Sequence, residues 1–244
     1  MARIDRQREM DLESPTLVEG LPGVGLVGKI ATDHLVESFE MDYYAACYCD
    51  GLPEVAVYEA DERTFRPPVR LYADEERDLL ALQSDVPVSP EAATEFATCL
   101  VGWFGEHDIT PICLSGLPQE KDDVPKLYGI GTGAGADRLD EHGIDRPDEN
   151  GLIRGPTGAL LAEAGRLGID SVGLVVQASA QFPDPESARA LLVKAIEPLA
   201  GVDIDTQPLI ERAEEIATAR ERLAKQMQEA DDESTQAQPL GMYQ

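Results

Sequence analysis

Lysine is scarce in this chain, and long apolar runs are absent. Of its 244 residues only Lys29, Lys121, Lys126, Lys194 and Lys225 are lysine. No stretch approaches the roughly 18 consecutive apolar residues that cross a membrane, and the first residues contain no apolar segment like that of a signal peptide. We therefore expect a soluble cytoplasmic protein that does not bind membranes.

The sequence also has little that would support metal binding or covalent catalysis. None of its four cysteines (Cys47, Cys49, Cys99 and Cys113) forms a C-x-x-C pair, so buried free thiols in a reducing cytoplasm are expected. The three histidines are not spaced as metal ligands, and no G-x-S-x-G motif is present. We expect no metal and no cofactor.

Basic residues are too few for general nucleic-acid binding. The chain has 47 acidic and 20 basic residues and a net charge of −27, whereas binding to a phosphate backbone needs a basic face. Two interpretations remain open, an acidic mimic that docks on a basic partner and a protein from a high-salt cytoplasm. The acidic clusters are spread along the whole chain, which favours the high-salt interpretation. They are Asp61-Glu62, Asp74-Glu75-Glu76, Asp122-Asp123, Glu214-Glu215 and Asp231-Asp232-Glu233.

Apolar strands alternate with amphipathic helices over residues 1–205, which predicts one α/β domain with helices on both faces of a mostly parallel or mixed sheet. Helices are expected after residue 26, after Ser89, over Gly158–Leu167 and after Asp184, and the acidic segment 137–149 is interpreted as a solvated surface. The expected strands are Thr16–Glu19, Tyr43–Cys49, Val55–Tyr58, Val69–Tyr72, Leu79–Leu82, Ile112–Leu114, Leu127–Ile130 and Ser171–Gln177.

The chain changes character after residue 205. Over residues 206–229 apolar side chains recur at spacings of three and four within a charged sequence, which predicts a helix. Such a helix either lies on its own domain or packs against a neighbouring subunit. Residues 230–244 are polar and lack a pattern that could form a core, so a disordered tail is expected there.

A glycine loop, residues 20–30, matches two nucleotide-binding motifs. Gly23, Gly25 and Gly28 spell G-x-G-x-x-G, while Gly28 and Lys29 end a G-x-x-x-x-G-K pattern. Against a phosphate loop, Ile30 occupies the place of the Ser or Thr that binds magnesium. The loop is interpreted as a tight structural turn, with an anion or nucleotide site as the alternative.

The chain ends with Met242, Tyr243 and Gln244, which follow the polar run of the tail. An apolar side chain and an aromatic ring in such a tail contribute nothing to a core, so we interpret them as groups that enter a pocket on another protein. The tether of residues 229–241 would give a typical reach of about 20 Å and a maximum of about 44 Å.

Several segments in order resemble the archaeal, haloarchaeal-type branch of the proteasome assembly chaperone family. The likeness spans roughly residues 14–228. It is carried by Glu19–Lys29, Leu114–Pro118, Tyr128–Thr132, Gly151–Leu161 and Phe182–Ala188.

The resemblance implies a three-layer α/β sandwich similar to the phosphorylase/hydrolase-like fold, without a known catalytic site. It also implies protein–protein contacts with the proteasome α-ring. Several archaeal members end in a hydrophobic residue, a tyrosine and one further residue that insert between α-subunits, and Met242, Tyr243 and Gln244 match that signature.

The sequence thus indicates a non-enzymatic proteasome assembly chaperone or adaptor, expected to be a homo-oligomer, that docks on proteasome α-ring subunits through its last three residues. Several tails acting together would add avidity. The alternative is an enzyme or regulator that binds a nucleotide or phosphorylated metabolite at Gly23–Lys29.

Overall fold

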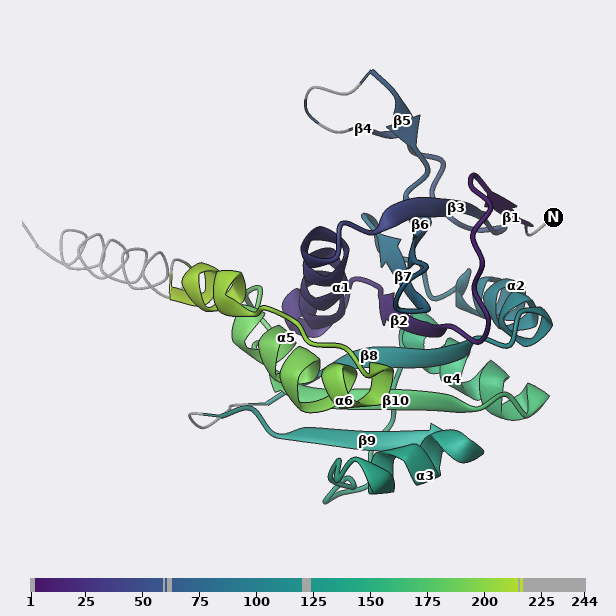
Figure 1. Cartoon of the computed structure of the whole chain (residues 1–244). Helices are drawn as coiled ribbons and strands as arrows, with labels where there is room; N and C mark the ends of the chain where they lie inside the picture. The colour runs from purple at the N-terminus through teal and green to yellow at the C-terminus, as the bar shows by residue number, and fades with distance from the viewer. Residues whose placement is uncertain (1–2, 59, 61–62, 120–123, 215, 217–244) are drawn as a thin grey trace, which may run out of the picture.

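The fold is built on one eight-stranded mixed sheet (Figure 1). The computed structural model describes residues 3–58, 60, 63–119, 124–214 and 216. The four central strands β7, β2, β8 and β10 run parallel, and the outer strands pair antiparallel. In spatial order the strands are β1 (Arg3–Arg6), β3 (Asp42–Tyr48), β6 (Val69–Asp74), β7 (Leu79–Ser84), β2 (Thr16–Gly20), β8 (Thr110–Pro118), β10 (Ser171–Ala178) and β9 (Leu127–Thr132).

Helices cover both faces of the sheet, which confirms the expected three-layer α/β architecture. One face carries α1 (Val27–Ser38), α3 (Ala134–Glu141) and α5 (Pro185–Leu191), which continues through a π-helical turn, η2 (Leu192–Ile196), into α6 (Glu197–Ala200). The other face carries α2 (Ala93–Glu106) and α4 (Gly155–Leu167).

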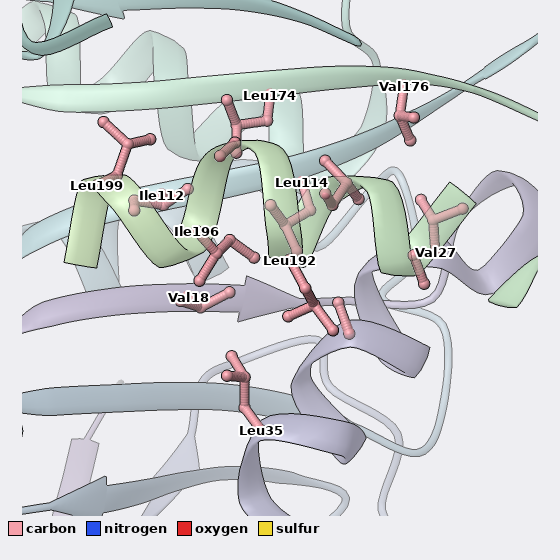
Figure 2. Close-up of a cluster of buried hydrophobic side chains, with 14 of the residues drawn as sticks. Val18, Val27, Leu35, Ile112, Leu114, Leu174, Val176, Leu192, Ile196 and Leu199 are labelled. Atoms are coloured by element: carbon pink, nitrogen blue, oxygen red, sulfur yellow. The ribbon is translucent and has the colours of Figure 1, made fainter. Parts of the chain in front are cut away.

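The alternation of side chains along the strands divides the core into two layers. Leu17 packs with the α2 and α4 layer, whereas its neighbour Val18 packs with the α1 and α5 layer. Because successive strand residues point to opposite faces, strands that are covered on both faces must be apolar at nearly every position. Figure 2 shows the core layer on the α1 and α5 side of the sheet, in which Leu192 and Ile196 of η2 pack with Val18 and other strand residues.

The interpretation of the acidic segment 137–149 as a solvated surface was incomplete. Residues Ala134–Glu141 form α3, with Leu139 buried against the sheet and the acidic side chains of Asp137 and Asp140 exposed. A single buried leucine in eight residues produces no helical repeat that the sequence could reveal. The sequence analysis also missed the strands β1 and β5 (Phe65–Arg66), since neither shows a clear alternation of apolar and polar residues.

Two peripheral segments complete the description. The strands β4 (Val57–Tyr58) and β5 pair as a small hairpin that extends from the body (Figure 1). Residues 207–214 are helical, and Leu209 is buried on the chain's own core. The rest of the predicted helix 206–229, apart from residue 216, and the predicted tail 230–244 lie outside the described residues. Within the described part of the chain, no helix is long and apolar enough to span a bilayer.

Candidate functional site

The glycine loop lies between β2 and α1, at the carboxyl ends of the parallel strands. It contains a short 3₁₀ turn, η1 (Val24–Leu26), which follows Gly23, while Gly28 is buried in the first turn of α1. In open α/β sheets this edge is the usual place for a ligand. The loop therefore holds the position in which a nucleotide site would be expected.

Two glycines of this region allow close contact between loops. Gly25 is buried with φ +63°, and its carbonyl accepts a hydrogen bond of 2.8 Å from the backbone N–H of Asp184. At Gly116 on β8, a Cβ atom would lie 2.4 Å from the carbonyl oxygen of Val24. The glycines thus let the loop pack directly on β8 and on the turn that follows β10.

The side chain of Lys29 takes part in a network of ion pairs. Its Nζ lies 3.0 Å from Asp33 and 3.5 Å from Asp85, and Arg70 pairs with Asp85 from the other side. Gln83 donates a 2.8 Å hydrogen bond to Asp33. Two cations therefore balance two carboxylates at the end of β7. The Lys29 ammonium already has anionic partners, so it differs from a phosphate-loop lysine, which must be open to phosphate.

Glu19 is a buried, hydrogen-bonded carboxylate beside the loop that the sequence analysis did not name as a candidate residue. It lies on β2 directly before the loop, and its side chain is completely buried. Its carboxylate accepts hydrogen bonds from the backbone N–H of Leu114 (2.9 Å) and of Leu21 (3.3 Å), and from the hydroxyl of Thr157 (3.0 Å). Glu19 thereby joins β2, β8 and the start of α4. The available signal was an acidic residue within an apolar strand, which needs partners if it is buried.

Burial in the core raises the pKa of Glu19 to about 7, although the hydrogen bonds from Leu114, Thr157 and Leu21 act in the opposite direction. A group whose folded-state pKa exceeds its unfolded value stabilises the fold at low pH. That contribution is complete below pH 4.5 and is lost as the pH rises through about 7.

We therefore expect wild-type stability to fall by about 3 kcal/mol across this pH window, relative to Glu19→Gln, whose side chain does not ionise. Denaturant unfolding at a series of pH values measures this difference. The comparison cancels the titration of the other acids. A difference between the two proteins that stays constant from pH 4.5 to pH 8 would show that Glu19 is not the titrating group.

A pocket of about 450 Å³ lies near β9, and both basic and acidic side chains line it. Lys126, Arg146 and Lys194 line it together with Asp145 and Asp148. Arg146 is paired with Asp140 at 2.6 Å, and the Lys194 ammonium donates to the carbonyl of Pro125 at 3.4 Å. Of its basic side chains, Arg146 thus already has an acidic partner within the chain.

In the described ranges, no group of three His, Cys, Asp or Glu side chains is arranged to hold a metal. His34 contacts the carbonyl of Asp205 at 2.7 Å and the hydroxyl of Ser38 at 3.2 Å. Met242, Tyr243 and Gln244 lie outside the described residues, so the geometry bears only on Gly23, Gly25, Gly28 and Lys29.

Comparison with curated proteins finds two relatives in Methanocaldococcus jannaschii. The chain is 27% identical to the uncharacterised protein MJ0106 over 221 residues, which is 89% of each chain. It is 28% identical to the uncharacterised protein MJ1210 over 234 residues, which is 93% of this chain and 90% of the relative.

Solved structures show the same fold. PbaA from Pyrococcus furiosus, described as an archaeal homolog of proteasome-assembly chaperone, matches with a TM-score of 0.80 and 26% identity over 95% of each chain. PbaB from the same organism, described as an archaeal proteasome activator, matches with a TM-score of 0.76 and 23% identity over 91% of this chain and 98% of PbaB. At that lower identity the second match shows the fold alone.

The sequence pattern of one family covers most of the chain, residues 17–224. This span includes the glycine loop, Glu19 and every strand of the parallel centre except the first residue of β2, Thr16. The chain belongs to the PAC2 family.

Proposed function

We propose that this chain is a non-enzymatic, cytoplasmic chaperone or adaptor of the proteasome that docks on the α-ring through Met242, Tyr243 and Gln244. The observation that carries the proposal is the match to PbaA, a proteasome-assembly chaperone homolog, over nearly the whole length of both chains. The resemblance of the last three residues to the docking signature of archaeal members supports the location of the contact.

The chemistry of these residues suits a narrow pocket between subunits. Met242 supplies an apolar, adaptable side chain, and Tyr243 supplies a ring with a hydroxyl at its far end. The carboxylate of Gln244, taken as the carboxyl terminus, would pair with a basic group on the ring. Binding through these three residues alone needs no complementary surface on the strongly acidic body.

We include self-association in the proposal, because several tails on one body would bind a ring with avidity. Tyr58 and Phe65 on the β4–β5 hairpin support it, since these residues are 81% and 74% exposed and are paired in the register of the two strands. Exposed apolar surface of this kind commonly marks a contact with another protein. A monomeric mass by light scattering at working salt would exclude self-association.

The direct test is binding of the purified full chain to an α-ring from the same cell, measured by biolayer interferometry at high salt. High salt suppresses general charge attraction and leaves pocket contacts in place. Saturable binding supports the proposal. Failure of the full chain to bind either the isolated ring or the complete 20S particle would overturn it.

The alternative, a nucleotide or phosphometabolite site at Gly23–Lys29, is opposed by the contacts of Lys29. Its ammonium is paired with Asp33 and Asp85, so a phosphate that bound there would compete with two carboxylates and be repelled by them. We expect calorimetry with ATP, GTP and NAD at high salt to show no binding tighter than millimolar. A micromolar affinity that disappears in Lys29→Ala would instead establish the alternative.

A further inference from the structure

The sulfur atoms of Cys49 and Cys99 are in direct contact. Cys49 follows β3, Cys99 lies within α2, and their Sγ atoms are 2.7 Å apart, with the Cys49 thiol donating to Cys99. All four cysteines of the chain are free thiols. A disulfide has an S–S distance of about 2.05 Å, so bond formation requires the two sulfurs to approach by only about 0.7 Å.

The backbone around the pair holds the two thiols together. Gly51 has φ +83°, and a Cβ atom there would lie 2.6 Å from the Cβ of Ala92, just before α2. The N–H of Leu52 closes the turn on the carbonyl of Cys49 at 3.2 Å. The turn after β3 is therefore pressed against the start of α2, and the contact between the sulfurs follows from the fold.

The two thiols are not equivalent. Cys49 is buried, with 6% of its surface exposed, whereas Cys99 is only partly buried and can be reached from solvent. The hydrogen bond from Cys49 lowers the pKa of Cys99, while burial and the nearby Asp50 carboxylate act against this, and the same hydrogen bond raises the pKa of Cys49. Because the thiolate is the reactive form of a cysteine, Cys99 is the more reactive of the two thiols and Cys49 is the less reactive one.

We propose that Cys49 and Cys99 are a redox-active dithiol, which a small peroxide such as hydrogen peroxide oxidises to an intramolecular disulfide. The Cys99 thiolate attacks one peroxide oxygen. The S–O bond forms, the O–O bond breaks, and the leaving hydroxide takes a proton to become water. The Cys49 sulfur then attacks the sulfur of the Cys99 sulfenic acid, so the S–S bond forms and the S–O bond breaks, and a second water leaves with the proton of Cys49. The two thiols lose two electrons in total, and the peroxide gains them.

The disulfide would join β3 to α2 and close the segment between them into a loop. That segment contains the β4–β5 hairpin and the strands β6 and β7. Cross-linking residues far apart in sequence restricts the unfolded chain, and native geometry that already places the sulfurs together limits strain. We expect oxidation to raise the melting temperature by about 10 °C.

The test treats the folded full chain with hydrogen peroxide and maps its thiols by mass spectrometry. The expected product has lost two hydrogen atoms, contains a linked Cys49–Cys99 peptide, and still has Cys47 and Cys113 available to alkylation after denaturation. A reducing dithiol should reverse both the mass change and the rise in melting temperature. Oxidation without a link, or a link between Cys99 and Cys47, would overturn the assignment.

Two variants separate the pair from general oxidation. Cys49→Ser should form no disulfide and should leave Cys99 as a sulfenic acid or a more oxidised form. Cys113→Ser, a matched change at a buried thiol on β8, should form the linked peptide as the wild type does. If either serine variant fails to fold, alanine replaces serine. The peptide map of the wild type decides the proposal without any variant.

Discussion

Deleting Met242–Gln244 is expected to weaken binding to a proteasome α-ring by at least about tenfold, while the melting temperature of the body stays unchanged. A buried aromatic anchor commonly contributes about 2 kcal/mol or more to an interface, so Tyr243→Ala should have nearly the same effect. The polar run of residues 230–244 lacks a pattern that could form a core, so we expect the deletion to leave the packing of the body intact. Titration on an immobilised ring, together with calorimetric melting, measures both quantities.

Two further variants identify what the ring recognises. Adding a few residues after Gln244 should also weaken binding, because the terminal carboxylate moves away while every side chain is kept. Leu240→Ala is the matched control, since it removes an apolar side chain from the same segment outside the last three residues, and its affinity should stay close to wild type. Wild-type affinity in the truncated protein would assign the contact to the folded body.

The strands of the parallel centre could be predicted from the sequence because their signal is local. A strand covered on both faces is apolar at nearly every position, as in the consecutive residues Leu80, Ala81 and Leu82 of β7. The start of α5 was equally readable, since Asp184 accepts from the N–H of Ser187 as a helix cap and Pro185 occupies the first turn. In contrast, α2 begins at Ala93 and not directly after Ser89, because residues 89–92 form a separate turn.

The contacts that define the candidate site could not be predicted, because they join residues far apart in sequence. Lys29 meets Asp85 only after β7 and α1 have packed together, and Glu19 meets Thr157 across the start of α4. The glycine motif around Lys29 could be recognised in the sequence, but the sequence alone could not decide between a phosphate-binding loop and a structural turn. The Cys49–Cys99 contact is of the same kind, since nothing in the spacing of the cysteines marks it.

A net charge of this size is expected to make the stability of the fold depend on salt concentration. For a net charge of −27 on a sphere of about 23 Å radius, the self-repulsion is about 20 kcal/mol at 0.1 M salt and about 5 kcal/mol at 2 M. The unfolded chain carries the same charge over a larger volume, so only part of this difference enters the stability. Several kcal/mol should remain, which is comparable to the whole stability of an ordinary domain.

We therefore expect the melting temperature to rise by at least about 10 °C between 0.1 M and 2 M salt, with loss of stability on dialysis below about 0.5 M. The described ion pairs work against this trend, since salt weakens pairs such as Lys29–Asp33, but these are too few to reverse it. Potassium chloride and sodium chloride should act alike, because screening depends on ionic strength, whereas sulfate would add its effect on apolar burial. A melting temperature that is the same at 0.1 M and 2 M would contradict an origin in a high-salt cytoplasm and would favour an acidic surface that meets a basic partner.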